Sequence, residues 1–371
     1  MSDTPPTIVF GAGGTGGHIY PALAVAQSLR ARSPHARLSF LCSDRAVDAR
    51  IMDPSGERWT PTPARPFSLR PKGLIRFMWH WGASLRVCRA ALAGADALVV
   101  TGGFVSAPAA RAAVIERVPI VLLNLDAVPG KASRLIAGRA RVCMTAQASG
   151  VTPATWERIP PVVRPNLLED RDPSRCRSEL GLDPDHPTLL ITGGSQGARS
   201  LNEVVLATLD AQPDLFAGWQ VLHQAGDGQE MLGRLTSAYE RAGVPGVVLP
   251  FVDRMDLAWG ASDAVVSRAG AGAVAEAWAT RTPAVFLPYP FHADDHQRVN
   301  AQPLIEAGCA LLVEDRVDAS ETLDTFVASL QRLLDHDTRC DMHAAYDSLG
   351  PADGAQCVAH RVLKLIFSST S

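Results

Sequence analysis

A unit of strand, glycine-rich loop and helix that occurs twice is the feature that most constrains the fold. Residues 8–23 read IVFGAGGTGGHIYPAL, and residues 188–206 read TLLITGGSQGARSLNEVVL. A glycine-rich turn between a strand and a helix lets a backbone approach a phosphate group at the helix N-terminus. We therefore expect two nucleotide-type half-sites, one in each half of the chain.

Short apolar runs alternate with helical stretches through both halves, which is typical of α/β proteins with parallel sheets covered by helices. At 371 residues, the chain is long enough for two such domains. Two Rossmann-like domains facing each other across a cleft form the GT-B arrangement of glycosyltransferases. The expected strands lie at 7–10, 37–42, 97–103, 119–124, 141–145, 188–194, 219–226, 246–251, 263–267 and 283–290.

The segment 156–175 is rich in proline and charge, so it predicts a linker with a hinge near 164–166. We expect one domain over 1–164 and the other over 165–350. The sequence leaves open whether the last helical segment, 353–371, returns to the first domain.

Composition excludes several classes of protein. A net charge of −3, from 35 basic and 38 acidic residues, gives no general attraction to nucleic acid. Seven scattered cysteines without a C-x-x-C pair predict a reduced, cytoplasmic protein without a disulfide framework or structural zinc. The sequence has neither a signal-peptide core nor an apolar run of about 18 residues, so we expect a soluble chain.

A dinucleotide enzyme is the first alternative. Gly11, Gly13 and Gly16 satisfy G-x-G-x-x-G, and Asp44 follows the second expected strand, where a Rossmann fold places the carboxylate that binds an NAD ribose. The second half, however, has no separate group of residues for hydride transfer. A UDP-sugar site explains its glycine turn better.

His18 follows Gly16 and Gly17 at the start of the first expected helix. The positive end of a helix dipole disfavours an imidazolium, so we expect a neutral ring that can accept a proton. His18 is therefore the candidate general base. The alternative is a histidine that only caps the turn.

A second turn of small residues, Gly270 to Ala273, precedes a helix that carries Glu276. Small residues let a ligand approach the backbone, and a carboxylate can accept hydrogen bonds from two ribose hydroxyls. The alternative for Glu276 is an ordinary exposed glutamate, but the preceding turn favours a ligand.

A cluster of titratable residues follows the last expected strand, consisting of His292, Asp294, Asp295 and His296. Imidazole and carboxylate groups bind metals, but four groups so close in sequence rarely converge on one ion. We therefore expect no metal, with Asp294 or Asp295 as a helix cap. Gln297 and Asn300 share one helical face and suit sugar hydroxyls.

The stretch from Arg58 to Ala95 contains no acidic residue. Basic residues around exposed aromatic ones are typical of proteins that rest on an anionic bilayer. Core packing is the alternative for its apolar members, which include Phe67, Leu69 and Met78. The predicted membrane patch comprises Arg70, Lys72, Leu74, Ile75, Arg76, Phe77, Trp79 and Trp81.

Seven segments between about residues 8 and 310 together resemble the MurG family: GGTGGHIYPAL, TGGFVSAP, TGGSQGARSLN, LHQAG, PFVDRM, SRAGAGAVAE and HADDHQRVNA. The resemblance implies an inverting, metal-independent GT-B hexosyltransferase of peptidoglycan synthesis, and so of cell-wall biogenesis, cell shape and division. It would move N-acetylglucosamine (GlcNAc) from UDP-GlcNAc to undecaprenyl-pyrophosphoryl-MurNAc-pentapeptide (lipid I), making lipid II. It also implies a peripheral protein on the cytoplasmic face of the inner membrane, with the cell-wall synthesis machinery as a partner and without nucleic acid.

The same resemblance assigns the acceptor to the first domain and the UDP-sugar to the second. Gly13, Gly14, Gly102 and Gly103 would lie near the acceptor pyrophosphate, and His18 would take the proton of the acceptor C4 hydroxyl. The implied donor-binding residues are Thr15, Gly16, Gly17, Arg164, Ser195, Val252, Ala271, Gly272, Ala273, Val274, Glu276 and Gln297.

One departure from the family pattern lies at Asn124 to Gly130, where NLDAVPG replaces the usual H-E-Q-N-G. Ala127 cannot make the donor-sugar contact of the family asparagine, so Asn124 or Asp126 is the expected substitute. Losing one such hydrogen bond reduces the rate by about tenfold. This departure keeps three alternatives open: another UDP-sugar transferase with a lipid acceptor, a UDP-sugar epimerase, and a homologue that binds without turnover.

Overall fold

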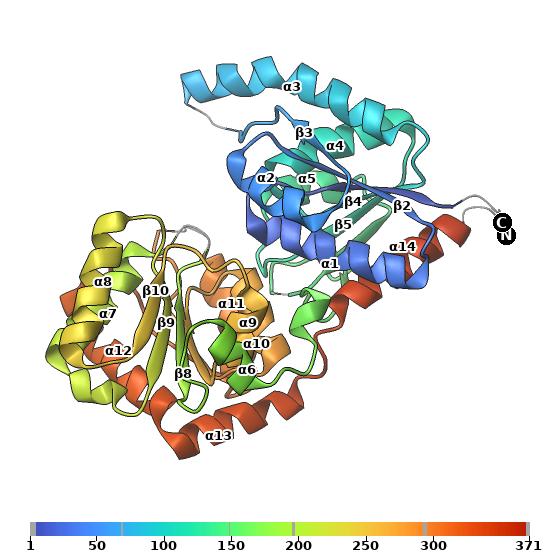
Figure 1. Ribbon diagram of the computed structural model, residues 1–371. Coiled ribbons are helices and arrows are strands. Elements are labelled where there is room, and N and C mark those ends of the chain that lie inside the picture. The colour runs from blue at the N-terminus through green and yellow to red at the C-terminus, as the bar shows by residue number, and fades with distance from the viewer. Residues whose placement is uncertain (1–4, 68–69, 148, 195–196, 292–294, 369–371) are drawn as a thin grey trace. The chain divides into compact units, whose positions relative to one another are not determined.

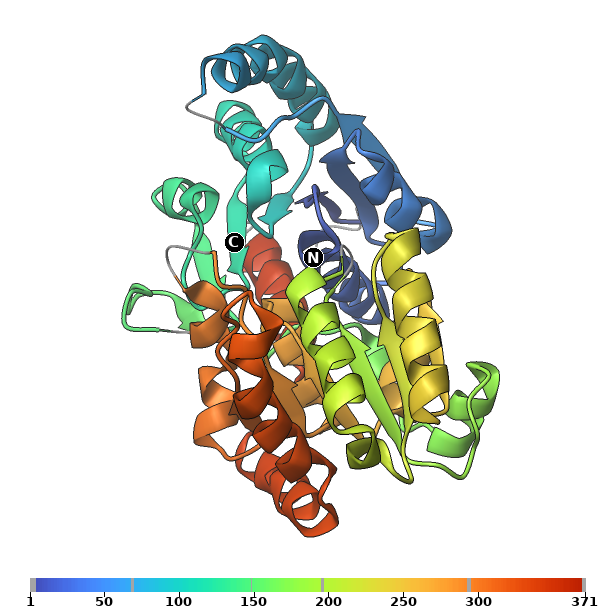
Figure 2. The same ribbon diagram turned by 90° about the vertical axis from the view of Figure 1, so that its left-hand side faces the viewer.

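The computed structural model describes residues 5–67, 70–147, 149–194, 197–291 and 295–368. The chain forms two compact units (Figures 1 and 2). Unit 1 is Met1–Pro165 with Asp353–Ser371, and unit 2 is Asn166–Ala352. The chain first leaves unit 1 after Pro165, within the segment where the sequence predicts the hinge.

Unit 1 contains a parallel sheet in the order β3-β2-β1-β4-β5-β6-β7. Its central strands β1, β4 and β5 are mostly apolar and, apart from Thr7, buried, as expected for strands with helices on both faces. The strands are β1 (Thr7–Gly11), β2 (Arg37–Ser43), β3 (Trp59–Thr62), β4 (Ala97–Val100), β5 (Ile120–Asn124), β6 (Val142–Thr145) and β7 (Glu157–Arg158).

The last helix of the chain belongs to unit 1, where it packs against α1 (Figure 1). This settles the question that the sequence leaves open for the C-terminal segment. The longest helix of the unit, α3, packs on α4. The helices of unit 1 are α1 (Gly16–Arg32), α2 (Ala46–Met52), α3 (Pro71–Leu92), α4 (Gly103–Glu116), α5 (Lys131–Ala137) and α14 (Gly354–Ser368).

Unit 2 repeats this topology with a parallel sheet in the order β10-β9-β8-β11-β12-β13. Its strands are β8 (Thr188–Thr192), β9 (Gln220–Gln224), β10 (Gly246–Leu249), β11 (Ala264–Ser267), β12 (Ala284–Phe286) and β13 (Ala310–Leu312). Its helices are α6 (Pro173–Glu179), α7 (Arg199–Ala211), α8 (Gln229–Ala242), α9 (Met255–Ala261), α10 (Ala271–Thr280), α11 (His296–Glu306), α12 (Ala319–Leu334) and α13 (His336–Ala345).

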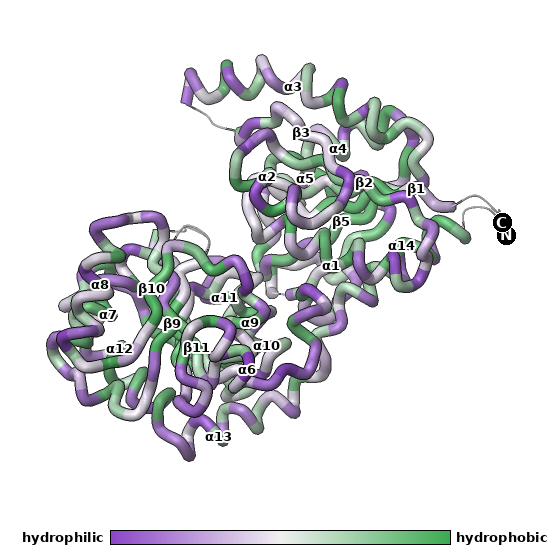
Figure 3. Tube along the Cα trace, in the orientation of Figure 1, coloured by the Kyte–Doolittle hydropathy of each residue, from purple (hydrophilic) through white to green (hydrophobic). Residues whose placement is uncertain are grey.

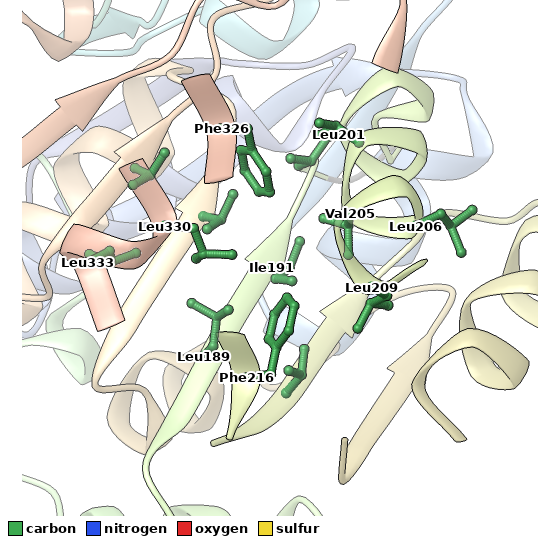
Figure 4. Packing of buried hydrophobic residues seen from close by; sticks show 14 of the residues in the cluster. Leu189, Ile191, Leu201, Val205, Leu206, Leu209, Phe216, Phe326, Leu330 and Leu333 are labelled. Atoms are coloured by element: carbon green, nitrogen blue, oxygen red, sulfur yellow. The ribbon is translucent and has the colours of Figure 1, made fainter. Parts of the chain in front are cut away.

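The main core cluster of unit 2 lies on one face of its sheet, beneath α7 and α12, which also pack against each other. Leu189 and Ile191 of β8 pack against Val205 of α7 and against Phe326 and Leu330 of α12 (Figure 4). These side chains are almost completely buried, and each contributes about 1.5–3 kcal/mol through its removal from water. Figure 3 shows that hydrophobic segments follow the strands of both sheets.

All ten strands expected from the sequence are present, and the prediction of two α/β, Rossmann-like domains is confirmed. The sequence misses β3, β7 and β13, which are two to four residues long. Pro61 interrupts the apolar pattern of β3, and a proline is tolerated there because β3 is an edge strand. Among the described residues, no helix is both long and apolar enough to cross a membrane.

Candidate active site

The candidate residues of each unit gather where the strand order reverses. This point lies between β1 and β4 in unit 1 and between β8 and β11 in unit 2. In open parallel sheets, ligands bind beyond the carboxyl ends of the strands at this point. The glycine loop after β1, Thr101–Gly103 after β4, the turn after β8 and the turn after β11 all begin there.

The first glycine loop is tightly packed, which explains two of its glycines. A Cβ on Gly13 would lie 2.7 Å from Asp48 Oδ2 and 2.8 Å from the Ser43 nitrogen. Gly14 has a φ of +95°, and its Cβ would lie 2.3 Å from the Phe104 ring. These positions exclude a side chain whatever the ligand.

Asp48 holds this loop, and the sequence analysis misses it. Its buried carboxylate accepts hydrogen bonds from the Gly14 nitrogen (2.8 Å), the Ser43 nitrogen (2.7 Å) and Ser43 Oγ (2.8 Å). The carboxylate that the sequence points to, Asp44, instead forms a two-pronged ion pair with Arg65 at 2.6 and 2.8 Å. One of the loop's N–H groups is therefore already bound to an anion of the protein itself.

His18 lies in the first turn of α1, and its ring is held from two sides. Its Nδ1 lies 3.0 Å from the carbonyl oxygen of Thr101, which can only accept, so Nδ1 carries the proton. The backbone of Gly103 lies along the ring, where an added Cβ would be 3.1 Å from Nε2. The geometry therefore leaves Nε2 as the lone-pair nitrogen.

Burial lowers the pKa of His18, which favours the neutral ring. The negative charge of Asp126, the bond to Thr101 and the charge of Asp48 oppose this shift in pKa. A neutral imidazole with Nδ1 protonated can accept a proton at Nε2. This arrangement is that of a general base.

The two polar side chains of the NLDAVPG segment, Asn124 and Asp126, differ in burial. Asn124 is buried, and its Nδ2 donates to the Asp126 carbonyl oxygen (2.6 Å) and to Thr145 Oγ1 (3.1 Å). Asn124 therefore fixes the loop and does not substitute for the family asparagine, which corrects that expectation. Asp126 is half-buried, near enough to His18 to influence its pKa, and Ala127 is buried.

The start of α1 also contacts Arg164. The Arg164 guanidinium lies 4.4 Å from the centre of the Tyr20 ring, and an added Cβ on Gly16 would lie 3.1 Å from that ring. Thr15 and Gly17 are exposed at the helix start. Arg164 is thus held next to the glycine loop of unit 1.

Two glycines that follow β8, Gly193 and Gly197, are packed as tightly as those of the first loop. A Cβ on Gly193 would lie 2.3 Å from the Ala198 nitrogen, and one on Gly197 would lie 2.6 Å from the Ala225 oxygen. Ser195, the predicted phosphate contact, lies outside the described residues. Val252, whose backbone is expected to contact uracil, is buried in the loop between β10 and α9.

His223, in the LHQAG segment, is a core residue. Its Nδ1 lies 3.0 Å from the Tyr239 hydroxyl and its Nε2 lies 3.1 Å from Asn202 Oδ1. Burial lowers the pKa of His223 to about 3. The ring is therefore neutral at physiological pH and bridges β9, α7 and α8.

The turn after β11 leads into α10, whose first residues are Ala271, Gly272 and Ala273. The N–H groups at the start of a helix have no partners within the helix, and no acidic residue occupies this first turn. Val274 is buried, with its nitrogen bonded to the Gly270 oxygen at 3.1 Å. This N-terminus suits a phosphate group.

Glu276 is half-buried and does not behave as an ordinary surface glutamate. Its Oε2 accepts a hydrogen bond of 2.8 Å from the indole N–H of the buried Trp259. This bond fixes the carboxylate one and a half turns into α10. A fixed carboxylate can accept ribose hydroxyls without a large loss of side-chain entropy.

The side chains of Gln297 and Asn300, both in α11, make different contacts. Gln297 is half-buried, and its Oε1 accepts from the Tyr289 nitrogen at 2.9 Å, which orients its NH2 group. Asn300 is buried and donates to the Ala269 oxygen at 3.2 Å, so it supports the α10 turn and is not a sugar contact.

The expected helix cap is not formed by Asp295, whose side chain makes no capping bond at the start of α11. His292 and Asp294 lie outside the described residues. Over the part of the chain that is described, no group of three His, Cys, Asp or Glu side chains is arranged to hold a metal ion.

A buried ion pair behind the α10 turn is a second feature that the sequence analysis misses. Arg268 donates to Asp315 Oδ2 (2.6 Å), to Ser200 Oγ (2.7 Å) and to the Leu287 oxygen (2.9 Å). These contacts join the ends of β11 and β12 to α7. The SRAGAGA pattern itself signals only a small-residue turn, since the partner Asp315 is 47 residues away.

The residues of the predicted membrane patch, most of which belong to α3, differ in their exposure to solvent. Ile75 and Trp79 are 65% and 82% exposed, and Arg70, Lys72 and Arg76 are exposed as well. Leu74, Phe77 and Trp81 are half-buried, and Phe77 packs against Trp81 with ring centres 5.3 Å apart. Met78 is exposed beside Trp79. Figure 3 shows hydrophobic and hydrophilic segments alternating along this helix.

Known proteins share this architecture. The crystal structure of Acinetobacter baumannii MurG matches with a TM-score of 0.72, at 23% identity over 97% of this chain and 100% of that chain. A calicheamicin glycosyltransferase matches with a TM-score of 0.67, at 16% identity over 99% of this chain. At these identities, the two structures support the fold alone.

Relatives found by sequence are more similar to this chain than the solved structures are. A curated protein from a Nocardioides strain is 36% identical, over 98% of this chain and 99% of its own length. A curated protein from Clavibacter sepedonicus is 38% identical, over 97% of this chain and 96% of its own length. Both are named UDP-N-acetylglucosamine–N-acetylmuramyl-(pentapeptide) pyrophosphoryl-undecaprenol N-acetylglucosamine transferase.

Two family matches cover most of the chain in the expected order. Residues 8–145 match the glycosyltransferase family 28 N-terminal domain, and residues 188–348 match the corresponding C-terminal domain. These ranges lie in unit 1 and unit 2 respectively. The chain therefore belongs to glycosyltransferase family 28.

Proposed function

We propose that this chain transfers GlcNAc from UDP-GlcNAc to the C4 hydroxyl of the MurNAc residue of lipid I, forming lipid II. The relatives named above carry this activity in their names and match nearly the whole chain. The observation that carries the proposal is the arrangement of His18, with Nδ1 bound to Thr101 and Nε2 left to accept a proton.

The reaction needs one proton transfer and one displacement. The acceptor oxygen O4 attacks C1 of GlcNAc while its proton passes to His18 Nε2, and the bond between C1 and the UDP oxygen breaks. Attack from the face opposite the leaving UDP inverts the configuration at C1. The low pKa of His18 keeps the base available near neutral pH.

The donor belongs to unit 2. We assign its phosphates to the start of α10, Ala271 to Val274, and to the turn that contains Ser195. Glu276 then accepts the ribose hydroxyls, Gln297 contacts the sugar and the Val252 backbone contacts uracil. The α10 N-terminus lacks acidic residues, so its partial positive charge stabilises the leaving UDP without a metal ion.

From unit 1, we assign Thr15, Gly16, Gly17 and Arg164 to the donor side as well. Gly102 and Gly103 flank His18 and lie next to the acceptor, with Gly13 and Gly14 behind them. The exposed face of α3 rests on the anionic, cytoplasmic surface of the inner membrane. Its exposed Ile75 and Trp79 next to three cationic side chains support this orientation.

The test is transfer of radiolabelled GlcNAc from UDP-GlcNAc to a short-chain lipid I analogue, with and without EDTA. We expect β-linked product, at a rate that EDTA does not change. Glu276→Ala should raise the KM for UDP-GlcNAc about tenfold, since it removes a charged hydrogen-bond acceptor. Glu321→Ala, an exposed glutamate of α12, is the control and should have no effect.

Two results would contradict the proposal. Binding of UDP-GlcNAc without any transfer to lipid I would show that this chain uses another acceptor or only binds. Loss of transfer in EDTA, restored by a divalent cation, would show that the leaving group depends on a metal.

A further inference from the structure

A pocket of about 480 Å³ lies beyond the carboxyl end of β2, beneath the start of α3. Arginines dominate its lining, and no function assigned above uses them together. The residues that line it are Asp44, Arg45, Arg65, Pro66, Gly73 and Arg76.

The pocket has more positive than negative side chains, with three arginines and one aspartate in its lining. Asp44 and Arg65 neutralise each other through their two-pronged pair, and Arg65 holds the pKa of Asp44 below its usual value. Among the described residues, Arg45 and Arg76 have no carboxylate partner. The pocket therefore carries a net charge of about +2, and the first turn of α3, which lacks acidic residues, adds a partial positive charge.

The pocket is connected to the catalytic histidine through contacts within unit 1. The Arg45 guanidinium lies 4.7 Å from the centre of the Phe104 ring. The same ring packs on Gly14, and the neighbouring Gly103 lies along the His18 ring. Arg45 is thus one aromatic ring away from the glycine loop.

The pocket is also lined by α3, which carries exposed apolar side chains. Gly73 and Arg76 belong to this helix, and Ile75 and Trp79 are exposed beside them. Unit 1 thus has, in this order, the proposed base, the two cations that line the pocket, and the exposed apolar side chains of α3. A lipid-linked sugar has the same order: a sugar hydroxyl, a diphosphate, and a hydrocarbon chain.

We propose that this pocket binds the diphosphate of the lipid-linked acceptor, with Arg45 and Arg76 as the two cations that contact it. The Arg65–Asp44 pair acts as a positioning pair beneath them. A diphosphate diester carries two negative charges, which matches the two unpaired arginines. The inference rests on the proposed function and names residues for its acceptor site.

Asp48 supports this assignment. The glycine loop, residues 11–17, has no cationic side chain, and its Gly14 nitrogen already donates to that carboxylate. The cations for the diphosphate must then come from a neighbouring site. The arginine pocket, on the loop after β2 that also leads to Asp48, is such a site.

The kinetic test compares Arg45→Gln and Arg76→Gln with Arg37→Gln as the control. Arg45 makes no side-chain cap bond and Arg76 is exposed, so both variants should fold. We expect each to raise the KM for the lipid I analogue by about 10- to 100-fold and to leave the KM for UDP-GlcNAc unchanged. Arg37, exposed at the opposite end of β2, should alter neither value.

An equal effect of Arg37→Gln on the acceptor KM would overturn the proposal, because it would indicate only a general attraction of charges. So would an unchanged acceptor KM in both pocket variants. With an acceptor analogue that carries a monophosphate, the loss in the two variants should shrink, since one of the two negative charges is absent.

A binding experiment separates this inference from the proposed function. Calorimetry with a short-chain polyprenyl diphosphate needs no turnover, so it remains informative if the chain transfers no GlcNAc. We expect binding by the natural chain and at least tenfold weaker binding by both pocket variants. Equally tight binding of short-chain phosphatidylglycerol to the same residues would assign the pocket to a membrane phospholipid and would overturn the acceptor assignment.

Discussion

The two units share a strand order but use their central loops in opposite ways. In unit 1, the glycine loop after β1 binds the buried carboxylate of Asp48 and carries a half-buried histidine. In unit 2, the turn after β11 exposes the N-terminus of α10 and is supported by the buried pair Arg268–Asp315. The loop after β1 thus positions the histidine that we propose as the base. The turn after β11 instead offers the N–H groups at the start of α10.

This difference shows that a common topology determines where a site lies but not its chemistry. Both units reverse their strand order at the same place, so both gather loops there. Each loop is held by a carboxylate that is remote from its glycines in sequence, Asp48 in one unit and Asp315 in the other. Five measurements test this contrast.

The largest effect is expected from His18→Gln, which removes the proposed base in unit 1. We expect kcat to fall about 10²- to 10⁴-fold, the usual contribution of a positioned base. His18 is not among the residues that we assign to the donor, so the affinity for UDP, measured by calorimetry, should not change. A fall in kcat of less than tenfold would show that another group takes the proton.

The pH profile of the natural chain tests the same residue. Burial lowers the pKa of His18, so the fall in kcat/KM on the acid side should lie below the usual histidine pKa of about 6.5. Asp126→Asn removes a charge that raises this pKa and should move the acid limb to still lower pH.

The second effect is on the stability of unit 2. Arg268→Leu leaves Asp315 buried without its cation, which costs about 3–5 kcal/mol of unfolding free energy. Hydrogen exchange should accelerate at the amides of β8 and β11 and stay unchanged at β1 and β4. Arg316→Leu, which breaks an exposed pair with Glu314, should cost less than about 1 kcal/mol. Equal acceleration in both sheets would mean that the units do not unfold separately.

The third effect is a pH dependence that belongs to unit 2. The pKa of His223 is about 3 in the folded state and about 6.5 when unfolded. Below pH 6.5, the unfolded chain therefore binds a proton that the folded one does not, so stability falls by about 1.4 kcal/mol per pH unit. At pH 5, the loss is about 2 kcal/mol, measured by hydrogen exchange in β9. His223→Gln should flatten this slope, whereas the exposed control His343→Gln should not.

The smallest effect concerns the first glycine loop. An added Cβ on Gly17 meets only Thr15 Oγ1, at 3.7 Å, so Gly17→Ala should stabilise α1 by about 0.5–1 kcal/mol. Gly13→Ala should destabilise the chain, because its Cβ would collide with Asp48. Thermal unfolding measures both. A higher KM for UDP-GlcNAc in the more stable Gly17→Ala would indicate that a ligand contacts this position.

The fold was largely predictable from the sequence, because central parallel strands are continuous apolar runs that end at glycine or proline. Residues 7–10 and 188–192 are examples. Two of the three strands that were missed, β3 and β7, lack this pattern. β3 contains Pro61, and β7 is the pair Glu157–Arg158 at the sheet edge, where pairing with a neighbour and not hydrophobicity defines the strand.

The site was predictable only in its local parts. His18, the α10 turn and Glu276 lie next to glycines that mark them. Asp48 and Asp315 acquire their functions from hydrogen bonds to distant residues, which no spacing in the sequence reveals. Asn300 shows the reverse error, since its helical face suggested a ligand contact but the fold uses its amide to support a turn.

The packing of α14 on α1 has a consequence for how this protein is made. Val358 and Val362 of α14 are completely buried, so the first unit is completed by residues that are synthesised after the whole of unit 2. Unit 2, whose residues are contiguous, has its whole sequence available earlier during synthesis. A ribosome that stalls shortly before residue 353 would release a nascent chain with one finished unit and one whose apolar surface is still exposed to chaperones and proteases.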